Sequence, residues 1–400
     1  MSQWMRATFL GTCSGGGPTE TRNCSSLVLD IIGDGSLWLI DCAEGTLRQF
    51  VLQPSPRRND DYRKMKASKI SNIFITHMHA DHIMGLVTML RNLLGYPSEV
   101  IPTPGISRPR INIYGPAGLR LFIRTNLTLT RTRTAESYAV HELLAATDEV
   151  TPCEPDSVRH SSEGRGRDIL CDDSGFWNKI AFGRSGRGEV HCYAGPIIHR
   201  DPCIGYIFCE PDPHPQDSCA RRPRKIVILG DTSDTSAFTS LIASTPGTVS
   251  LLVHEATDVH IPSHIDRGLA VKRPPNVVQR ACADRGHSTP ADAGRTAGLW
   301  GAEQLVLNHI GARFSAPTGS NSPYQRQVRA IIQEMEHQAS EEWKKTSAVV
   351  SVGSWSEPTW RAIAAYDYLT VDVQPSSYVT PLPAGPSRPP SSAFLPRKGK

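Results

Sequence analysis

The feature that most constrains the fold is a cluster of potential metal ligands at residues 77–82, which read HMHADH. It directly follows residues 68–76, a run rich in Ile that predicts a buried strand. Four such side chains within six residues cannot all reach one ion from a regular helix or strand, but a loop can divide them between two ions. Imidazole and carboxylate together suit zinc, with manganese or iron as alternatives. A polar loop that happens to be His-rich is the weaker alternative.

Further strands alternate with helical patterns along the chain. Short apolar runs at 225–229 (KIVIL), 249–253 (VSLLV) and 304–307 (QLVL) predict three more buried strands. Polar residues follow these runs, as expected where strands deliver side chains to one edge of a sheet. This strand–loop–helix repetition predicts a layered α/β protein.

Helix signals stand between these strands. The spacing of apolar residues predicts a helix over 83–94 that stops at Gly95. Another helix is expected to begin after Ser288 as its N-cap, with Pro290 in the first turn. Residues 324–345 predict a long exposed helix.

Two regions do not fit a compact core. Residues 147–188 mix Pro, Ser, Gly, Asp and Arg with little periodicity, so we expect a surface insertion there. Residues 374–400 are rich in Pro and Ser with a basic end, which predicts a disordered tail. The folded domain is therefore predicted to span residues 1–373.

Composition limits the partners and the compartment. Lys+Arg 43 against Asp+Glu 39 gives a net charge of +4, which is too weak to argue for an anionic partner. Ten cysteines without a Cys-x-x-Cys pattern indicate reduced thiols in a cytoplasmic or nuclear protein. No apolar run approaches the ~20 residues that a membrane-spanning helix needs, so no membrane partner is expected.

Later strand ends can complete a two-metal site. His199, Asp231 and His309 each stand where a predicted strand would deliver a side chain to the sheet edge. A carboxylate such as Asp231 can bridge two cations about 3.5–4 Å apart. Taken singly, His199 could be a solvated loop residue, Asp231 a helix cap and His309 a buried side chain bonded to backbone.

A Gly-rich loop at residues 11–17 could suggest a phosphate-binding loop. It lacks the Gly-Lys-Ser/Thr ending that such a loop requires. We expect instead a turn that lets the backbone approach the metal site.

More motifs run in a fixed order from about residue 9 to residue 373. They are GTCSG (11–15), RNCS (22–25), LIDCAEGT (39–46), GY (205–206), GDT (230–232), HEAT (254–257), GHST (286–289), HIGARF (309–314) and AAYDYL (364–369). With HMHADH, this set resembles the ribonuclease Z family of tRNA 3′-processing endonucleases, in the metallo-β-lactamase superfamily. The His cluster alone indicates only the superfamily, whereas HEAT followed by HST singles out this family.

The resemblance implies a four-layer αββα sandwich, two mixed sheets back to back with helices outside, as a catalytic domain over residues 1–373. It also implies two Zn²⁺ ions per subunit, without excluding Mn²⁺. The implied ligands are His77, His79 and His199 for one ion, Asp81, His82 and His309 for the other, and Asp231 as the bridge.

The implied reaction is endonucleolytic removal of 3′ trailers from precursor tRNA. Metal-activated hydroxide attacks the phosphodiester and leaves a 3′-OH on the tRNA. In the family pattern, Asp81 accepts the proton of the attacking water, and His287, positioned by Glu255, protonates the departing oxygen. Without the resemblance, Glu255 reads as a loop carboxylate and His287 as an ordinary residue before a helix.

Substrate binding is less clearly marked. Arg313, Lys272 and Arg273 are candidates for contacts with RNA phosphates, against the alternative of solvated surface charges. Bacterial relatives carry a long tRNA-binding arm between the GY and GDT motifs, but here residues 207–225 are short. Residues 147–188 and 260–284 are the candidates to replace it. The short length also resembles the short form of the family, which implies a homodimer.

Two other functions are consistent with parts of the sequence. One is another hydrolase of the superfamily, such as a phosphodiesterase, arylsulfatase or thioesterase, which should lack the HEAT and HST pair. The other is a non-catalytic RNA-binding protein with structural zinc. Structural zinc sites are usually closed and Cys-rich, whereas this cluster contains no Cys.

Overall fold

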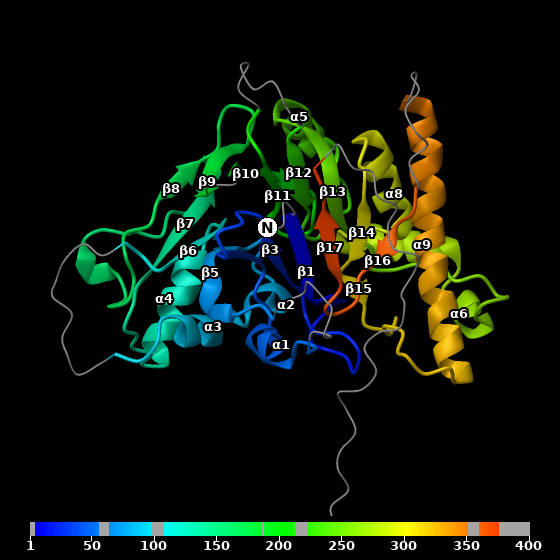
Figure 1. The fold of residues 1–400 in the computed structure, drawn as a ribbon, viewed down its shortest axis with the longest axis horizontal. Coiled ribbons are helices and arrows are strands. Elements are labelled where there is room, and N and C mark those ends of the chain that lie inside the picture. Colours follow the sequence, from blue (N-terminus) through cyan, green and yellow to red (C-terminus); the bar gives the residue numbers. More distant parts are fainter. Residues whose placement is uncertain are drawn as a thin grey trace, which may run out of the picture.

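The computed structural model describes residues 5–55, 64–97, 108–185, 188–212, 222–350 and 360–375. These residues form two large sheets that face each other, with helices on both outer sides (Figure 1). The first sheet has the order β17 (Thr370–Val373), β1 (Met5–Gly11), β3 (Ser26–Asp30), β4 (Leu37–Ile40), β5 (Ile70–Phe74), β6 (Ile111–Pro116), β7 (Tyr138–Leu144) and β8 (Asp168–Leu170). The second has the order β16 (Ile363–Ala364), β14 (Leu305–Asn308), β13 (Thr248–Glu255), β12 (Arg224–Ile228), β11 (Cys203–Cys209), β10 (Gly188–Ile197) and β9 (Trp177–Ser185).

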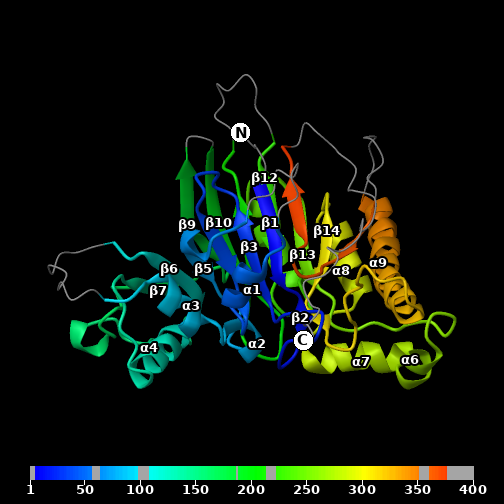
Figure 2. The same cartoon turned by 60° about the horizontal axis from the view of Figure 1, so that its bottom comes forward.

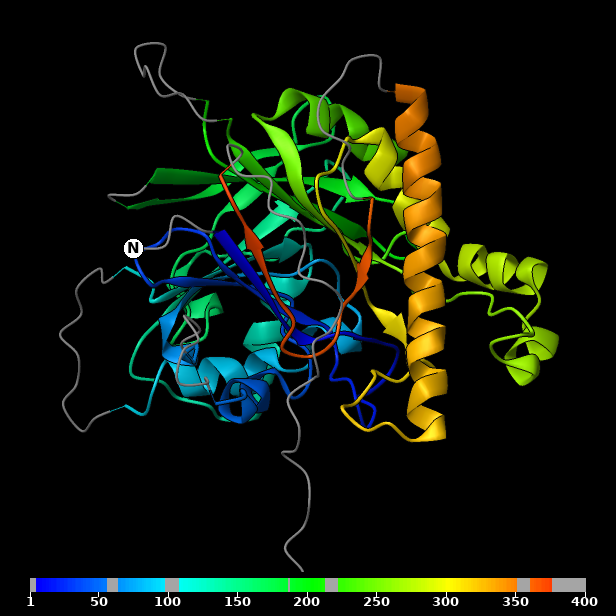
Figure 3. The ribbon, with the colours of Figure 1, turned by 45° about the vertical axis from the view of Figure 1, so that its right-hand side comes forward.

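Helices cover the outer face of each sheet. The first sheet is covered by α1 (Thr46–Leu52), α2 (Ala80–Ile83), α3 (Leu86–Leu93) and α4 (Leu119–Leu129). The second carries α5 (Thr239–Ser244), α8 (Pro290–Leu299) and α9 (Pro323–Val350), while α6 (Arg267–Lys272) and α7 (Pro275–Arg285) extend away from it (Figure 3). No helix among the described residues is both long and apolar enough to cross a membrane.

The layers follow from the two-residue period of the strands. In β4, Trp38 and Ile40 enter the core between the sheets, whereas Leu37 and Leu39 pack under the outer helices. In β11, Phe208 faces the central core and Ile207 the helices. Both faces of these strands are buried, which accounts for their continuous apolar runs. The predicted αββα sandwich is confirmed.

The predicted strands correspond to β5, β12, β13 and β14. The helix predicted over residues 83–94 corresponds to α3, which ends just before Gly95, a residue with a φ of 65°. The predicted N-cap of α8 was wrong by one residue. Thr289 is the cap and forms a capping box with Asp292, whereas the Ser288 hydroxyl donates to the Thr232 carbonyl. The long helix, α9, is exposed on one face only, because its apolar stripe packs on α8.

The surface insertion expected at 147–188 is smaller than predicted. The second half of this range contains β8 and β9, which extend the two sheets at their edges. In β9, Trp177 and Ile180 are buried, and Lys179 between them has a φ of 48°. This positive φ breaks the strand alternation, so the sequence showed no two-residue period. Of the predicted tail, residues 376–400 lie outside the described part of the chain, and the boundary at 373 stays a prediction.

The C-terminal segment joins both sheets. β16 pairs with β14 in the second sheet, and β17 then pairs with β1 in the first. Between them, Asp367 accepts hydrogen bonds from the Thr12 hydroxyl and the Asn23 amide. Buried Arg22 donates to the Ala365 carbonyl and to Thr12. The connection between β16 and β17 is therefore bonded to the loop that follows β1.

Candidate metal centre

The HMHADH segment lies at one end of the first sheet, just after β5. His77 and His79 are on the connecting loop, and Asp81 and His82 are in the first turn of α2. Gly85 lets this segment approach its neighbour closely, because a Cβ there would lie 2.0 Å from the Ala43 carbonyl oxygen. The segment was expected to be a loop, but its second half is the helix α2. The division between loop and helix points the four side chains in different directions.

Three strand ends of the second sheet supply the remaining predicted ligands. His199 follows β10, Asp231 follows β12, and His309 stands between β14 and β15 (Ile310–Gly311) with a φ of 51°. β15 pairs in parallel with β2 (Cys13–Ser14), which holds the loop after β1 beside His309. All seven predicted ligand residues therefore meet at one end of the sandwich.

The seven residues form two neighbouring groups. Within each group, the ligand atoms all lie within 4.8 Å of one another. The two groups are His77, His79, His199 and Asp231, and Asp81, His82 and His309. The ring of His287 also lies within this distance of Asp231 and His309. The two carboxylate oxygens of Asp231 face different groups. Its Oδ2 lies 3.6 Å from His77 Nε2, and its Oδ1 lies 3.3 Å from His309 Nε2. This placement suits a carboxylate that bridges two ions.

In four of the five histidines among these ligands, the ring nitrogen Nδ1 is hydrogen-bonded to another group of the protein. The pairs are His82 Nδ1 with Asp41 Oδ2 (2.7 Å), His77 Nδ1 with Thr76 Oγ1 (3.0 Å), His199 Nδ1 with the Gly286 carbonyl (2.7 Å) and His309 Nδ1 with Thr257 Oγ1 (2.9 Å). Such contacts fix the Nδ1–H tautomer and leave Nε2 free to bind an ion. Gly286 has a φ of 74°, and a Cβ there would lie 2.7 Å from His199 Nδ1.

The residues present fit metal ions on direct structural grounds. The Nε2 atoms of His77 and His199 are buried without a hydrogen-bond partner. A buried, unpaired ring nitrogen is costly unless an ion or water satisfies it. The small cavity beside His82, Asp231 and His309 has a volume of about 10 Å³, which is close to the space of a single water.

The histidines of the centre lower the pKa values of its two carboxylates, Asp231 and Asp81. Burial raises the pKa of Asp231, but His309, His82 and His77 outweigh it and hold this pKa well below its usual range. Burial likewise opposes ionisation of Asp81, whose pKa is nevertheless held low by His309 and His82. Both carboxylates are therefore ionised and available to cations at neutral pH.

Asp81 is also held by backbone. The Gly15 amide, in the Gly-rich loop after β1, donates to Asp81 Oδ2 at 2.9 Å. His309 Nε2 lies 3.5 Å from the same oxygen. This agrees with the expectation that the Gly-rich loop approaches the metal site and does not form a P-loop.

His287 and Glu255 lie next to the ligand groups. His287 Nδ1 is 3.1 Å from Glu255 Oε1, and this oxygen also accepts from the Thr232 amide at 2.6 Å. Burial lowers the pKa of His287, but its hydrogen bond to Glu255 and the charges of Glu255 and Asp231 together outweigh burial and raise the pKa above the ordinary value. The pair thus offers a proton-bearing imidazole, oriented by a buried carboxylate, at the edge of the centre.

The predicted RNA-contact residues have different surroundings. Arg273 is hydrogen-bonded to Asp258, and Arg313 Nη1 lies 3.5 Å from the same carboxylate. Lys272, at the end of α6, is exposed and has no ion-pair partner among the described residues. Of the three residues, only Lys272 thus has its charge unpaired within the described part of the chain.

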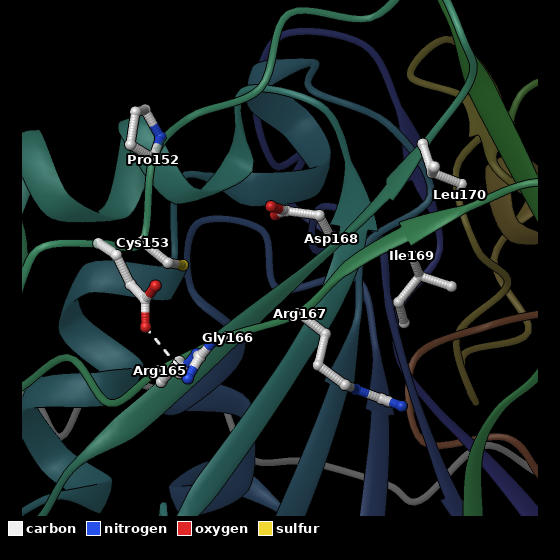
Figure 4. A pocket seen from close by; sticks show the side chains of 9 residues that line it. Pro152, Cys153, Arg165, Gly166, Arg167, Asp168, Ile169 and Leu170 are labelled. Carbon is white, nitrogen blue, oxygen red and sulfur yellow. Dashed lines mark ion pairs between the residues drawn. The ribbon is translucent and has the colours of Figure 1, made fainter.

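The connection between β11 and β12 comprises only residues 210–223. The helices that do extend from the body are α6 and α7, which lie along the same edge of the molecule as α2 (Figure 2). A wider groove of about 920 Å³ is found at the β7–β8 edge (Figure 4). It is lined by residues 152–154 and 165–170, none of which belongs to the ligand groups.

Three residues of the centre were missed by sequence reasoning: Asp41, Thr257 and Asp201. Asp201 Oδ2 lies 2.7 Å from His79 Nε2. Asp41 and Thr257 lie inside recognised motifs, LIDCAEGT and HEAT, and this was the available signal. Their role depends on ring orientation, which a motif does not specify.

Two facing sheets with His and Asp ligands at one shared end define a hydrolase of the metallo-β-lactamase fold. Curated relatives include zinc phosphodiesterase ELAC protein 1 of Mus musculus, 30% identical over 78% of this chain and 87% of the relative. Ribonuclease Z of Streptococcus sanguinis is 31% identical over 78% of this chain and 91% of the relative. The chain belongs to the ribonuclease Z family.

A solved structure shares the fold, and a family model matches part of the chain. The crystal structure of human tRNase Z, short form (ELAC1), superposes with a TM-score of 0.56 at 26% identity, covering 92% of this chain and 99% of that chain. A family described as anti-Pycsar protein Apyc1 matches residues 5–94, which include the HMHADH segment.

Proposed function

We propose that this protein is a zinc-dependent endoribonuclease that removes 3′ trailers from precursor tRNAs. The observation that carries the proposal is the joint placement of two ligand groups, bridged by Asp231, beside the His287–Glu255 pair. The names of the relatives, ribonuclease Z and zinc phosphodiesterase, support this activity and this metal.

The His and Asp ligand atoms of the centre lead us to propose two zinc ions per subunit. His77, His79 and His199 would hold one ion, Asp81, His82 and His309 the other, and Asp231 both. When bound, two cations lower the pKa of a water between them and stabilise the charge that develops on the phosphoryl oxygens. The ligand groups found among the described residues contain no Cys, which argues against purely structural zinc.

The chain's own residues divide the proton transfers. Asp81, fixed by the Gly15 amide, accepts the proton of the attacking water. The water oxygen bonds to phosphorus while the bond from phosphorus to the 3′ oxygen of the tRNA breaks. His287 then donates its proton to that oxygen, so the tRNA ends in a 3′-OH and the trailer in a 5′-phosphate. Glu255 orients His287 and favours its protonated form.

The test is incubation of purified protein with a 3′-extended precursor tRNA, with and without a chelator. We expect one cut at the trailer junction, a 3′-OH on the tRNA, loss of cleavage with chelator and recovery with Zn²⁺. The absence of a cut with added Zn²⁺, while a small phosphodiester is hydrolysed, would instead indicate another hydrolase of this superfamily. RNA binding without any hydrolysis would indicate the non-catalytic alternative.

Two further proposals concern the state of the protein. We propose a homodimer by analogy with short forms of the family, and light scattering should then give twice the 43.8 kDa chain mass. We also propose a cytoplasmic or nuclear location, because the nine cysteines of the described residues are all unpaired. Fractionation of source cells checks the location.

A further inference from the structure

His79 is bound to the protein differently from the other histidines of the centre. Its outer contact uses Nε2, which lies 2.7 Å from Asp201 Oδ2, whereas the other four use Nδ1. With Nε2 engaged, Nδ1 is the His79 atom left for an ion. The partner side chain also differs, because Asp201 is 57% exposed whereas Asp41, the partner of His82, is 5% exposed.

The position of Asp201 is set by the same short loop that delivers His199. This loop connects β10 to β11, and Asp201 follows His199 by two residues. The loop thus supplies His199 to the first ligand group, and its Asp201 contacts His79 of the same group. Arg200 Nε lies 3.6 Å from Asp201 Oδ2, so the carboxylate is shared with a largely exposed guanidinium.

We propose that Asp201 is the positioning residue for His79. Its carboxylate accepts a hydrogen bond from His79 Nε2–H and fixes the ring with Nδ1 toward the ion. The hydrogen bond also makes the lone pair of Nδ1 a better ligand for the ion. The inference rests on the proposed metal site. Partners of this kind typically change metal affinity by about 10–100-fold when they are removed. Because Asp201 contacts His79 and not His82 or His309, the effect should be confined to the ion of the first group.

An exposed Asp–His pair could also be a surface contact of no consequence, since such pairs often contribute little. The two possibilities differ in metal affinity. A surface contact would leave both ions bound as in the wild type, whereas a positioning contact weakens one of two binding steps.

The experiment measures binding of Zn²⁺ alone to the metal-stripped full chain, by competition with a chromogenic chelator. The variants are Asp201→Asn, Asp201→Ala and the conservative Asp201→Glu. Asp173→Asn is the matched control, because Asp173 is an exposed Asp in the turn before β9. Circular dichroism checks folding of each variant before titration.

We expect Asp201→Asn and Asp201→Ala to weaken one of the two binding steps about 10–100-fold, with the other step unchanged. Asp201→Glu should recover part of the loss, and the control should match the wild type. Unchanged affinity in Asp201→Ala, or an equal loss at both steps, would overturn the proposal. The titration contains no RNA, so failure of precursor cleavage would count against the proposed function and not against this inference.

Discussion

His82 shows how the protein's own side chains orient a proposed metal ligand. Its Nδ1 bonds to Asp41 Oδ2 at 2.7 Å, and Asp41 also accepts from the Thr76 hydroxyl. Burial lowers the pKa of His82, but Asp231 and Asp41 outweigh it and raise the pKa to about 10. Without an ion, the pocket therefore favours a proton at the place where a cation would bind. Metal binding must then release that proton.

His287 should matter for the chemistry and not for holding metal. His287→Ala is expected to reduce kcat for precursor tRNA by about 10²–10⁴-fold, the usual contribution of a general acid. A substrate whose leaving group is p-nitrophenolate needs little protonation, so the variant should lose much less on it. Single-turnover assays on both substrates, with metal analysis, measure this contrast.

Asp81→Ala is the comparison, because Asp81 belongs to a ligand group and should lose metal and activity together. An equal loss on both substrates by His287→Ala, with metal retained, would refute its role as an acid.

His141 is a buried histidine remote from the centre, on β7. Its Nε2 bonds to Asn112 Oδ1, and its Nδ1 accepts from Arg167. Burial, with Arg167 and Arg120 nearby, lowers its pKa to about 3. Between pH 6.5 and pH 3, His141 is protonated in the unfolded chain but stays neutral in the folded protein. Stability from this group is therefore present above pH 6.5 and is lost as the pH falls toward 3.

We expect His141→Gln to flatten the acid dependence of unfolding by about 2 kcal/mol between pH 7 and pH 5. Urea unfolding at both pH values measures this difference. The exposed His264→Gln serves as control and should keep the wild-type dependence. An unchanged slope in His141→Gln would contradict this prediction.

The ligand residues could be predicted from sequence because strands end where polar residues begin. His199, Asp231 and His309 all follow runs of buried apolar residues, and the fold brings such strand ends to one edge. Their hydrogen-bond partners could not be predicted. Whether Asp201 reaches His79 depends on the path of one loop, which no periodicity describes.

At the scale of elements, we expect α6 and α7 to contact RNA away from the cut. α7 leads directly into Gly286 and His287, and Lys272 at the end of α6 is exposed. We expect Lys272→Ala to weaken precursor tRNA binding several-fold at low salt, to reduce the salt slope by about 1 and to leave kcat unchanged.

Filter binding at several salt concentrations measures this slope. Lys344→Ala, an exposed lysine on α9, is the matched control and should keep the wild-type slope. Identical slopes for both variants would exclude Lys272 from the RNA-binding surface.

Sequence predicted elements well where their periods are regular and poorly where one residue breaks the pattern. β5, β12, β13 and β14 have continuous apolar runs because helices cover their outer face and the other sheet covers their inner face. β9 was not predicted, because the positive φ of Lys179 breaks the alternation of buried and exposed residues. The start of α8 was misplaced by one residue because Ser288 and Thr289 can both cap a helix, and only the contact of Ser288 with Thr232 decides between them.

For the whole molecule, metal binding should contribute to stability, because the ligands come from both sheets. Removal of metal leaves buried His and Asp side chains without their cations. At metal concentrations about 100-fold above Kd, each ion adds about 2.7 kcal/mol. We expect chelation to lower Tm by about 5 °C, and added Zn²⁺ to restore it. Asp231→Asn, which lacks the bridging charge, should respond much less, and an unchanged Tm in the wild type would contradict a structural contribution of the metal.

The pairing of β17 with β1 means that β1 receives this neighbour only after the chain has been synthesised as far as Val373. A translation product that stops before residue 363 would lack β17 and β16, the outer neighbours of β1 and β14, so each sheet would present an unpaired edge to other chains. Incomplete copies should therefore aggregate or be degraded, and should not persist as partly active nuclease.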